Sequence, residues 1–247
     1  MVGQKEWIQK HKREFINNLI KKSGAVPDDN PSAIFMAGLP GAGKTEFSNN
    51  LISNLRLNVV RLDMDEIATN IEGYKPEAAD KYREGASSLL NGTFDAVVKQ
   101  GLDFIMDGTF SSKYARRNVN RAINHGYSVK IIYIYQDPKL AWRFTLEREK
   151  VEHRSIDLDG FIESYFNTIQ NVRDILSTVP VGKIALDIIL KDSYNKSREV
   201  RSNVLANDID KIINNCYDNK EQLRSYLNGW RDKTKTNEEK TDPRWYR

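Results

Sequence analysis

The sequence predicts an α/β fold in which a parallel β-sheet carries helices on both faces. Short apolar runs alternate with helical stretches along most of the chain, and parallel strands need such crossover connections. A length of 247 residues is sufficient for a sizeable buried core. A hydrophobic content of 39% with 29% charged residues is typical of a soluble globular protein, and it excludes wholesale disorder and a membrane-spanning composition.

Apolar spacing and loop residues predict an N-terminal helix and the strands of the sheet. Apolar residues at helical spacing among lysines predict a surface helix over residues 5–22. A loop rich in Gly, Pro, Asp and Asn follows, and the apolar run at 33–37 is the first expected buried strand. Further strands are expected at residues 58–62, 104–106, 129–135 and 184–190.

Further helices are predicted in the second half of the chain. A helix is expected over residues 138–150 and is followed by a loop through Gly160. The stretch 204–227 has a helical pattern, and the charged segment 230–247 is expected to be frayed. We divide the chain into an N-terminal helix and linker, a core, and a C-terminal helical extension with a charged tail, at residues 1–31, 32–192 and 193–247.

Net charge and cysteine usage indicate which partners and which cellular compartment to expect. The net charge of +4 is a mild excess that tolerates anionic ligands but does not resemble the dense basic stripe of a nucleic-acid-binding protein. Cys216 is the single cysteine, so no internal disulfide can form, and the N-terminal segment has no apolar stretch typical of an export signal. We therefore expect a cytoplasmic protein without a membrane segment.

A phosphate-binding loop follows the first expected strand directly. It matches the pattern G-x-x-x-x-G-K-[ST] (Walker A) with Gly38, Leu39, Pro40, Gly41, Ala42, Gly43, Lys44 and Thr45. Glycines let backbone N–H groups approach a polyphosphate closely at the start of a helix. Lys44 is expected on the β- and γ-phosphates, and Thr45 on Mg²⁺. The alternative is an ordinary glycine-rich turn between a strand and a helix.

Such a loop serves kinases, GTPases, motors and regulatory ATPases alike, so the rest of the chain must decide between them. The sequence contains no Asn-Lys-x-Asp motif for reading guanine, because Asn195-Lys196-Ser197-Arg198 lacks the final acid. A GTPase is therefore disfavoured.

Carboxylates follow the second and third expected strands, at the sheet edge where ligands of open α/β sheets bind. Asp65 has the residue type and location of a general base that accepts a hydroxyl proton during phosphoryl transfer. The alternative is that Asp63 or Asp65 only caps the next helix. Asp107 is expected at the Mg²⁺ ion or the acceptor hydroxyl and Thr109 at the substrate, unless they form a plain strand-end turn.

Arginines in and after the helix at 138–150 are candidates for stabilising the transferring phosphoryl group. Arg148 and Arg154 lie at the helix end and in the following loop, where a lid could close, whereas Arg143 is expected to pair with Glu147. The alternative is a solvated charged helix. A second group could meet an anionic acceptor, although at least two of its members are expected to be solvated: Arg116, Arg117 and Arg121.

The order of these motifs resembles the zeta-toxin family of P-loop kinases over roughly residues 32–190. That family phosphorylates UDP-N-acetylglucosamine on the sugar 3′-hydroxyl with ATP, and many members are toxins held by an antitoxin. The resemblance implies a P-loop kinase fold with ATP and Mg²⁺ as cofactors. It implies Lys44 and Thr45 at the phosphates and Mg²⁺, Asp65 as base, Asp107 and Thr109 near the sugar, and Arg148 with Arg154 as phosphoryl clamps.

The chain departs from the family pattern in two places. Asp107 stands where the family often has Glu. After its second-strand acid the family commonly has a basic residue and then His-Pro, whereas this chain has Ile67-Ala68-Thr69-Asn70 and later Lys75-Pro76. Both departures concern the acceptor pocket.

The leading hypothesis is thus an ATP-dependent kinase acting on a hydroxyl of a nucleotide sugar, with an antitoxin as a possible protein partner. A second hypothesis is a kinase for another hydroxyl, such as a nucleoside, an antibiotic or a nucleic-acid 5′ end. The sequence disfavours nucleic acid because aromatic residues are not evidently interleaved with the second arginine group. A third is a non-catalytic ATP-binding regulatory module.

Overall fold

The structure is a computed structural model of the chain, and it describes residues 4–152, 157–180, 182–213 and 217–236. Its described part contains a six-stranded sheet in the order β2-β3-β1-β4-β5-β6. The strands are β1 (Ser32–Ala37), β2 (Val60–Asp63), β3 (Phe104–Asp107), β4 (Ser128–Tyr135), β5 (Ile184–Lys191) and β6 (Ser197–Arg201). The first five are parallel, as the sequence predicts, and β6 is an antiparallel edge strand that the prediction lacked.

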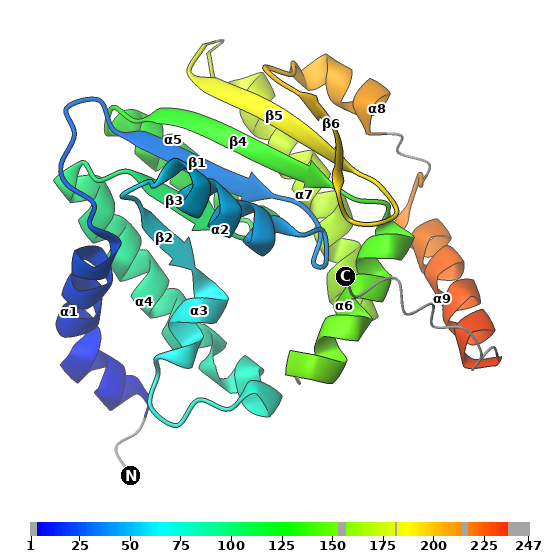
Figure 1. Cartoon of the computed structure of the whole chain (residues 1–247), viewed down its shortest axis with the longest axis horizontal. Helices are drawn as coiled ribbons and strands as arrows, with labels where there is room; N and C mark the ends of the chain where they lie inside the picture. Colours follow the sequence, from blue (N-terminus) through cyan, green and yellow to red (C-terminus); the bar gives the residue numbers. More distant parts are fainter. Residues whose placement is uncertain (1–3, 153–156, 181, 214–216, 237–247) are drawn as a thin grey trace.

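Helices lie on both faces of the sheet (Figure 1). One face carries α4 (Ala79–Gln100), α5 (Ala115–Asn124) and α7 (Leu158–Thr178), while α2 (Lys44–Leu55) covers β1 and β3 on the other. Crossovers between parallel strands are right-handed. The chain moves one way across the sheet from β1 to β2 and the opposite way in its later crossovers, and these two directions place helices on opposite faces.

Helix α1 (Gln4–Ser23) is the predicted N-terminal surface helix, and it packs beside α4 (Figure 1). Its buried Ile8 joins a small apolar cluster that includes Ile67 of α3 (Met64–Thr69) and Leu89 of α4. At Gly92 of α4 the two helices approach so closely that a Cβ would lie 3.0 Å from the Nζ of Lys12. Helix α1 therefore supports α3, which follows the second strand.

The C-terminal part differs from the prediction of a single helix over residues 204–227. A 3₁₀ turn at Ala206–Asp208 leads into α8 (Ile209–Ile212), and α9 spans Lys220–Thr236. Polar residues interrupt the pattern, since the side chain of Asn219 accepts a hydrogen bond from the backbone N–H of Gln222 at the start of α9. Part of the segment expected to fray is therefore helical, and residues 237–247 lie outside the described part.

Two long helices connect β4 to β5. Helix α6 (Pro138–Glu152) contains the predicted helix at 138–150. The predicted loop through Gly160 is too long, because α7 begins at Leu158, where Asp157 accepts a hydrogen bond from the Gly160 N–H at 2.7 Å.

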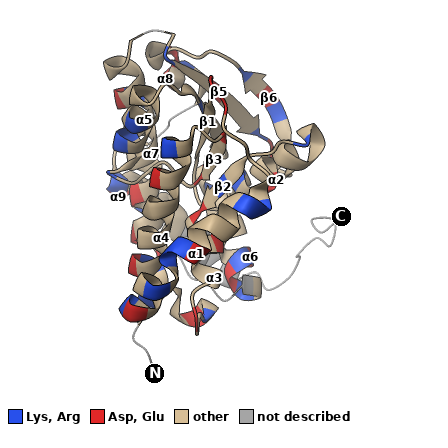
Figure 2. Ribbon diagram, turned by 90° about the vertical axis from the view of Figure 1, so that its left-hand side faces the viewer, with Lys and Arg blue, Asp and Glu red and all other residues tan. Residues whose placement is uncertain are grey.

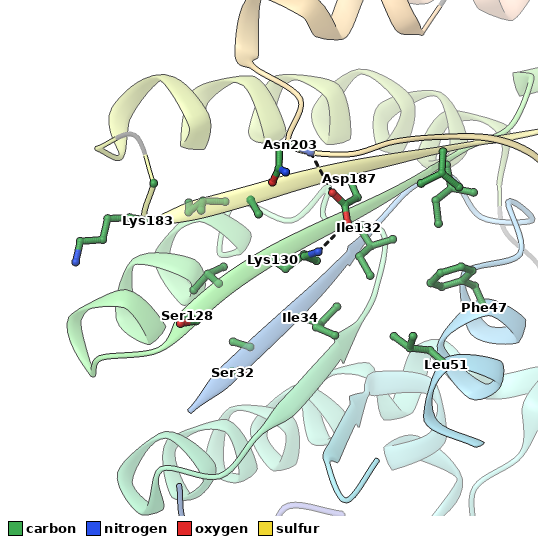
Figure 3. A pocket seen from close by; sticks show the side chains of 17 residues that line it. Ser32, Ile34, Phe47, Leu51, Ser128, Lys130, Ile132, Lys183, Asp187 and Asn203 are labelled. Atoms are coloured by element: carbon green, nitrogen blue, oxygen red, sulfur yellow. Dashed lines mark hydrogen bonds and ion pairs between the residues drawn. The ribbon is translucent and has the colours of Figure 1, made fainter. Parts of the chain in front are cut away.

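The part of the sheet that α2 leaves uncovered forms a hollow of about 740 Å³ (Figure 3). Ser32 and Ser128, the first residues of β1 and β4, line it, so it extends toward the amino ends of the strands. An ion pair of 2.9 Å joins Lys130 and Asp187 across this face. The hollow thus extends away from the carboxyl edge of the sheet, where the phosphate-binding loop and the predicted carboxylates lie.

Acidic and basic residues are intermixed along α1 and α4 (Figure 2). This mixture agrees with the mild net charge. None of the described helices combines the length and apolar character that a membrane span needs.

Candidate active site

The phosphate-binding loop connects β1 to α2 and has the backbone that its glycines permit. Gly38, Gly41 and Gly43 have φ angles of 140°, 77° and 81°, which residues with a Cβ rarely adopt. Gly43 precedes α2, and no side chain in the described residues caps that helix end. The first N–H groups of α2 therefore have no side-chain acceptor and suit an anion.

Lys44 is the buried cation of this loop. Its side-chain Nζ donates a hydrogen bond of 2.7 Å to the Leu39 carbonyl. Burial lowers the pKa of Lys44 to about 8; the negative charges of Asp107 and Asp65 oppose this shift, and the positive charge of Arg148 adds to it. The structure thus gathers three predicted site residues close enough to Lys44 for their charges to act on it.

Asp107 is buried at the end of β3 and is held by two donors. Its Oδ2 accepts a hydrogen bond of 2.7 Å from Ser48 Oγ on α2 and one of 2.8 Å from an Nη atom of Arg61 on β2. Its side chain is 3% exposed, and Arg61 supplies the opposite charge that a buried carboxylate needs. These contacts fix the carboxylate at the strand end, and its role toward a ligand stays a prediction.

Arg61 contacts three carboxylates at once. Besides Asp107 it binds Asp63 at 2.7 Å and Glu66 at 2.8 Å. Burial alone would lower the pKa of Arg61, but the hydrogen bond to Asp107 and the three negative charges raise it. Burial, together with the charges of Asp107 and Asp65, raises the pKa of Asp63, although Arg61 opposes this.

The helix-capping alternative applies to Asp63 and not to Asp65. The Oδ1 of Asp63 accepts hydrogen bonds from the N–H groups of Asp65 at 2.8 Å and Glu66 at 3.3 Å at the start of α3. Asp65 lies in the first turn of α3 with an exposed side chain. Its carboxylate is therefore positioned by the cap without being the cap.

Thr109 joins the third strand to the phosphate-binding loop and to α7. Its carbonyl accepts hydrogen bonds from the Gly38 N–H at 3.2 Å and from Thr168 Oγ1 at 2.8 Å. Its hydroxyl lies 2.6 Å from Ser111 Oγ. The backbone of Thr109 thus helps to set the loop.

Helix α6 carries Arg143 and Arg148, and the structure tests only the pairing expected for Arg143. Arg143 pairs with Glu147 at 3.6 Å, which confirms that expectation. Arg148 is exposed on α6, and its charge reaches Lys44. Arg154 lies outside the described residues.

The second arginine group is mostly engaged elsewhere. Arg116 pairs with Asp174 at 2.8 Å and Arg121 with Asp95 at 2.5 Å. Arg117 lies over the ring of Tyr114, with 4.5 Å between its guanidinium carbon and the ring centroid. This contact pairs one arginine with one tyrosine three positions earlier, and the expectation about nucleic acid stays a prediction.

Ser48 and Arg61 are site residues that the sequence analysis missed. Signals for both exist: Ser48 lies one helical turn after Lys44, and Arg61 is a charged residue inside an apolar strand, two positions before Asp63. Their role depends on the β2–β3 pairing, in which Asp63 lies beside Asp107.

The residues at the carboxyl edge offer few protein ligands for Mg²⁺. In the described part of the chain, no cluster of three or more His, Cys, Asp or Glu side chains could hold a metal ion. Thr45, in the first turn of α2, and Asp107 provide a hydroxyl and a carboxylate oxygen. Mg²⁺ commonly takes few protein ligands beside phosphate oxygens and waters, so this donor set suits a nucleotide-bound ion.

The fold is similar to that of chains in solved structures of a toxin–antitoxin system and of a second two-protein complex. A structure of the PezAT chromosomal toxin–antitoxin system of Streptococcus pneumoniae superposes with a TM-score of 0.66 at 15% identity, covering 93% of this chain and 98% of that chain. The AvrRxo1-ORF1:-ORF2 structure with ATP gives a TM-score of 0.63 at 12% identity, covering 81% and 68%. The native AvrRxo1-ORF1:-ORF2 complex gives 0.60 at 11% identity, covering 83% and 68%. At these identities the similarity shows the α/β P-loop fold.

The sequence itself matches the family model described as zeta toxin over residues 17–205. The matched region includes the whole six-stranded sheet, the phosphate-binding loop and the carboxylates around Arg61. Because the match covers more than half of the chain, the protein belongs to the zeta toxin family.

Proposed function

We propose that the protein is an ATP-dependent kinase that transfers the γ-phosphate to an alcohol hydroxyl of a nucleotide sugar. The observation that carries the proposal is the grouping around Lys44. Asp65, Asp107 and Arg148 come from three separate elements, and the charge of each acts on the Lys44 ammonium. A base, a buried carboxylate and a further cation beside a phosphate-binding lysine are components that phosphoryl transfer uses.

The loop and the first turn of α2 would hold the nucleotide phosphates. N–H groups after Gly43 and the ammonium of Lys44 would bind anions at this helix end. Thr45 and Asp107 would hold Mg²⁺, which when bound neutralises phosphate charge. Asp107 can do so because an ionised carboxylate has acceptor sites beyond those used by Ser48 and Arg61.

Asp65 would accept the proton of the acceptor hydroxyl. As the hydroxyl oxygen bonds to the γ-phosphorus, the bond between that phosphorus and the bridging oxygen breaks, ADP leaves with the electron pair, and the proton remains on Asp65. Arg148 and Arg154 would balance the charge on the transferring group. Thr109 would contact the acceptor, because its backbone is fixed beside the loop.

A kinase for a different hydroxyl is the second candidate, and one observation favours it. The shorter carboxylate of Asp107 is drawn toward Ser48 and Arg61 at a single oxygen. An acceptor sugar would therefore meet a carboxylate placed differently from that of the Glu that the family often has at this position.

A protein partner is part of the proposal. The structures similar in fold include one from a toxin–antitoxin system and one of a two-protein complex, and we infer that an antitoxin binds this chain. Its expected site of action is the cytoplasm, where ATP is abundant.

Incubation with γ-labelled ATP, Mg²⁺ and a panel of acceptors tests the proposal. The panel contains nucleotide sugars, free sugars, nucleosides and a nucleic-acid 5′ end, and mass analysis identifies the labelled product. We expect label on the nucleotide sugar. Label on another acceptor supports the second candidate, and ATP binding without any labelled acceptor contradicts both.

A further inference from the structure

A continuous set of hydrogen bonds joins the phosphate-binding helix to the helix of the proposed base. Ser48, one turn after Lys44 on α2, donates to Asp107 Oδ2 at 2.7 Å. The same oxygen accepts from Arg61 at 2.8 Å, and Arg61 binds Asp63 Oδ2 at 2.7 Å. The other oxygen of Asp63 accepts the N–H of Asp65 at 2.8 Å.

Arg61 is the link that the other contacts cannot replace. It is the side chain that joins the carboxylates of β2 and β3, and with 17% exposure it is shielded from water. Its guanidinium presents several donors in a fixed plane, so binding of one carboxylate orients the groups that bind the others. A point charge could neutralise these acids without fixing their directions.

We propose that Arg61 is a positioning residue that couples nucleotide occupancy of the phosphate-binding loop to the placement of Asp65. This inference rests on the proposed function, in which Asp65 is the base. Movement of the first turns of α2 on phosphate binding shifts Ser48 and with it the shared oxygen of Asp107. Arg61 passes this shift to Asp63, whose other oxygen holds the first turn of α3.

The test compares Arg61→Met, Arg61→Lys and Ser48→Ala with the parental chain. Lys130→Met is the matched control, because it breaks a similar ion pair between neighbouring strands of the same sheet, at Asp187 (Figure 3). Unfolding is measured for each variant, since an unpaired buried Asp107 is destabilising. Ser48→Ala keeps every charge, so it remains informative if Arg61→Met does not fold.

The first readout is hydrogen exchange at the Asp65 amide, with and without a non-hydrolysable ATP analogue. In the parental chain and in Lys130→Met the analogue should slow this exchange by at least about tenfold. Arg61→Met should exchange faster and lose the response, Ser48→Ala should lose the response, and Arg61→Lys should recover part of it. An unchanged response in Arg61→Met, or in Ser48→Ala where Arg61→Met does not fold, overturns the coupling.

The second readout separates this inference from the proposed function. Arg61→Met should lower kcat by tenfold or more while the ATP dissociation constant stays within about twofold. A parental chain without kinase activity contradicts the proposed function, and the amide exchange then decides the coupling by itself. A variant with normal kcat contradicts the positioning role even though the kinase assignment stands.

Discussion

Lys44 and Leu39 are joined by a hydrogen bond of 2.7 Å from the side-chain Nζ to the backbone carbonyl. The ammonium of the phosphate-binding loop is thus held by the loop itself. Burial lowers the pKa of Lys44 to about 8, so this ammonium lies in a place that disfavours its charge. Phosphate oxygens would supply the missing negative charge and raise that pKa again.

The first prediction follows for nucleotide binding above pH 8. The free protein loses the Lys44 proton there, so ATP binding should take up a proton and its affinity should fall by up to about tenfold per pH unit. Below pH 8 this group should give no pH dependence. Calorimetry in two buffers of different ionisation enthalpy at pH 7 and pH 9 measures the uptake. Equal heats in both buffers at pH 9 would count against the lowered pKa.

The stability of the free protein should respond with the opposite sign. Lys44 has a pKa of about 8 in the folded state, whereas an ordinary lysine has a pKa of 10.5, so the unfolded state binds more protons in that window. Stability should therefore rise with pH between about 8 and 10.5 relative to Lys44→Met. Urea unfolding of both chains across this range supplies the comparison.

Gly41→Ala is the second prediction. Gly41 has a φ of 77°, and a Cβ there would meet the Ala141 carbonyl and lie 2.7 Å from Thr145 Oγ1 on α6. We expect at least tenfold weaker ATP binding. Gly126→Ala is the matched control, since its φ is 83° with open space around the Cβ, and it should cost about 1 kcal/mol of stability without affecting ATP. Similar ATP affinities in both variants would contradict the close packing.

Asp65→Asn is the third prediction. Loss of the proton acceptor should lower kcat by about 10²- to 10⁴-fold, while ATP affinity and the melting temperature stay near parental values. The stability prediction follows because Asp63 makes the capping hydrogen bonds. Steady-state kinetics with calorimetry provides both numbers, and a parental kcat would remove Asp65 from the reaction.

The fourth prediction concerns Arg148→Ala and Arg154→Ala. Each should lower kcat more than ATP affinity, because a cation that meets the developing charge acts mainly in the transition state. If they share the task, the double variant should lose less free energy of activation than the two single losses combined. Parental turnover in both single variants would leave α6 as an ordinary charged helix.

The sequence predicted the parallel part of the fold because each strand is a short apolar run between helices. It missed β6, since Ser197–Arg201 carries charged residues typical of an exposed edge. At the site, the phosphate-binding loop could be predicted because its positive φ angles favour glycine, and the glycines of residues 38–43 stand close together in the sequence. Arg61 and Ser48 could not be assigned in this way, because their partner Asp107 lies 46 and 59 residues away and meets them only through strand pairing and helix packing.

The most direct test of the central claim is a time course of ADP and phosphorylated acceptor in one reaction. The parental chain, ATP, Mg²⁺ and a nucleotide sugar are mixed, and both products are quantified, with Lys44→Met as the inactive control. Phosphoryl transfer to an alcohol predicts one phosphorylated acceptor for each ADP, and neither product with Lys44→Met. The reaction is repeated with each other acceptor of the panel described above. ADP that accumulates with free phosphate, and without a phosphorylated acceptor in any of these reactions, would contradict the kinase assignment.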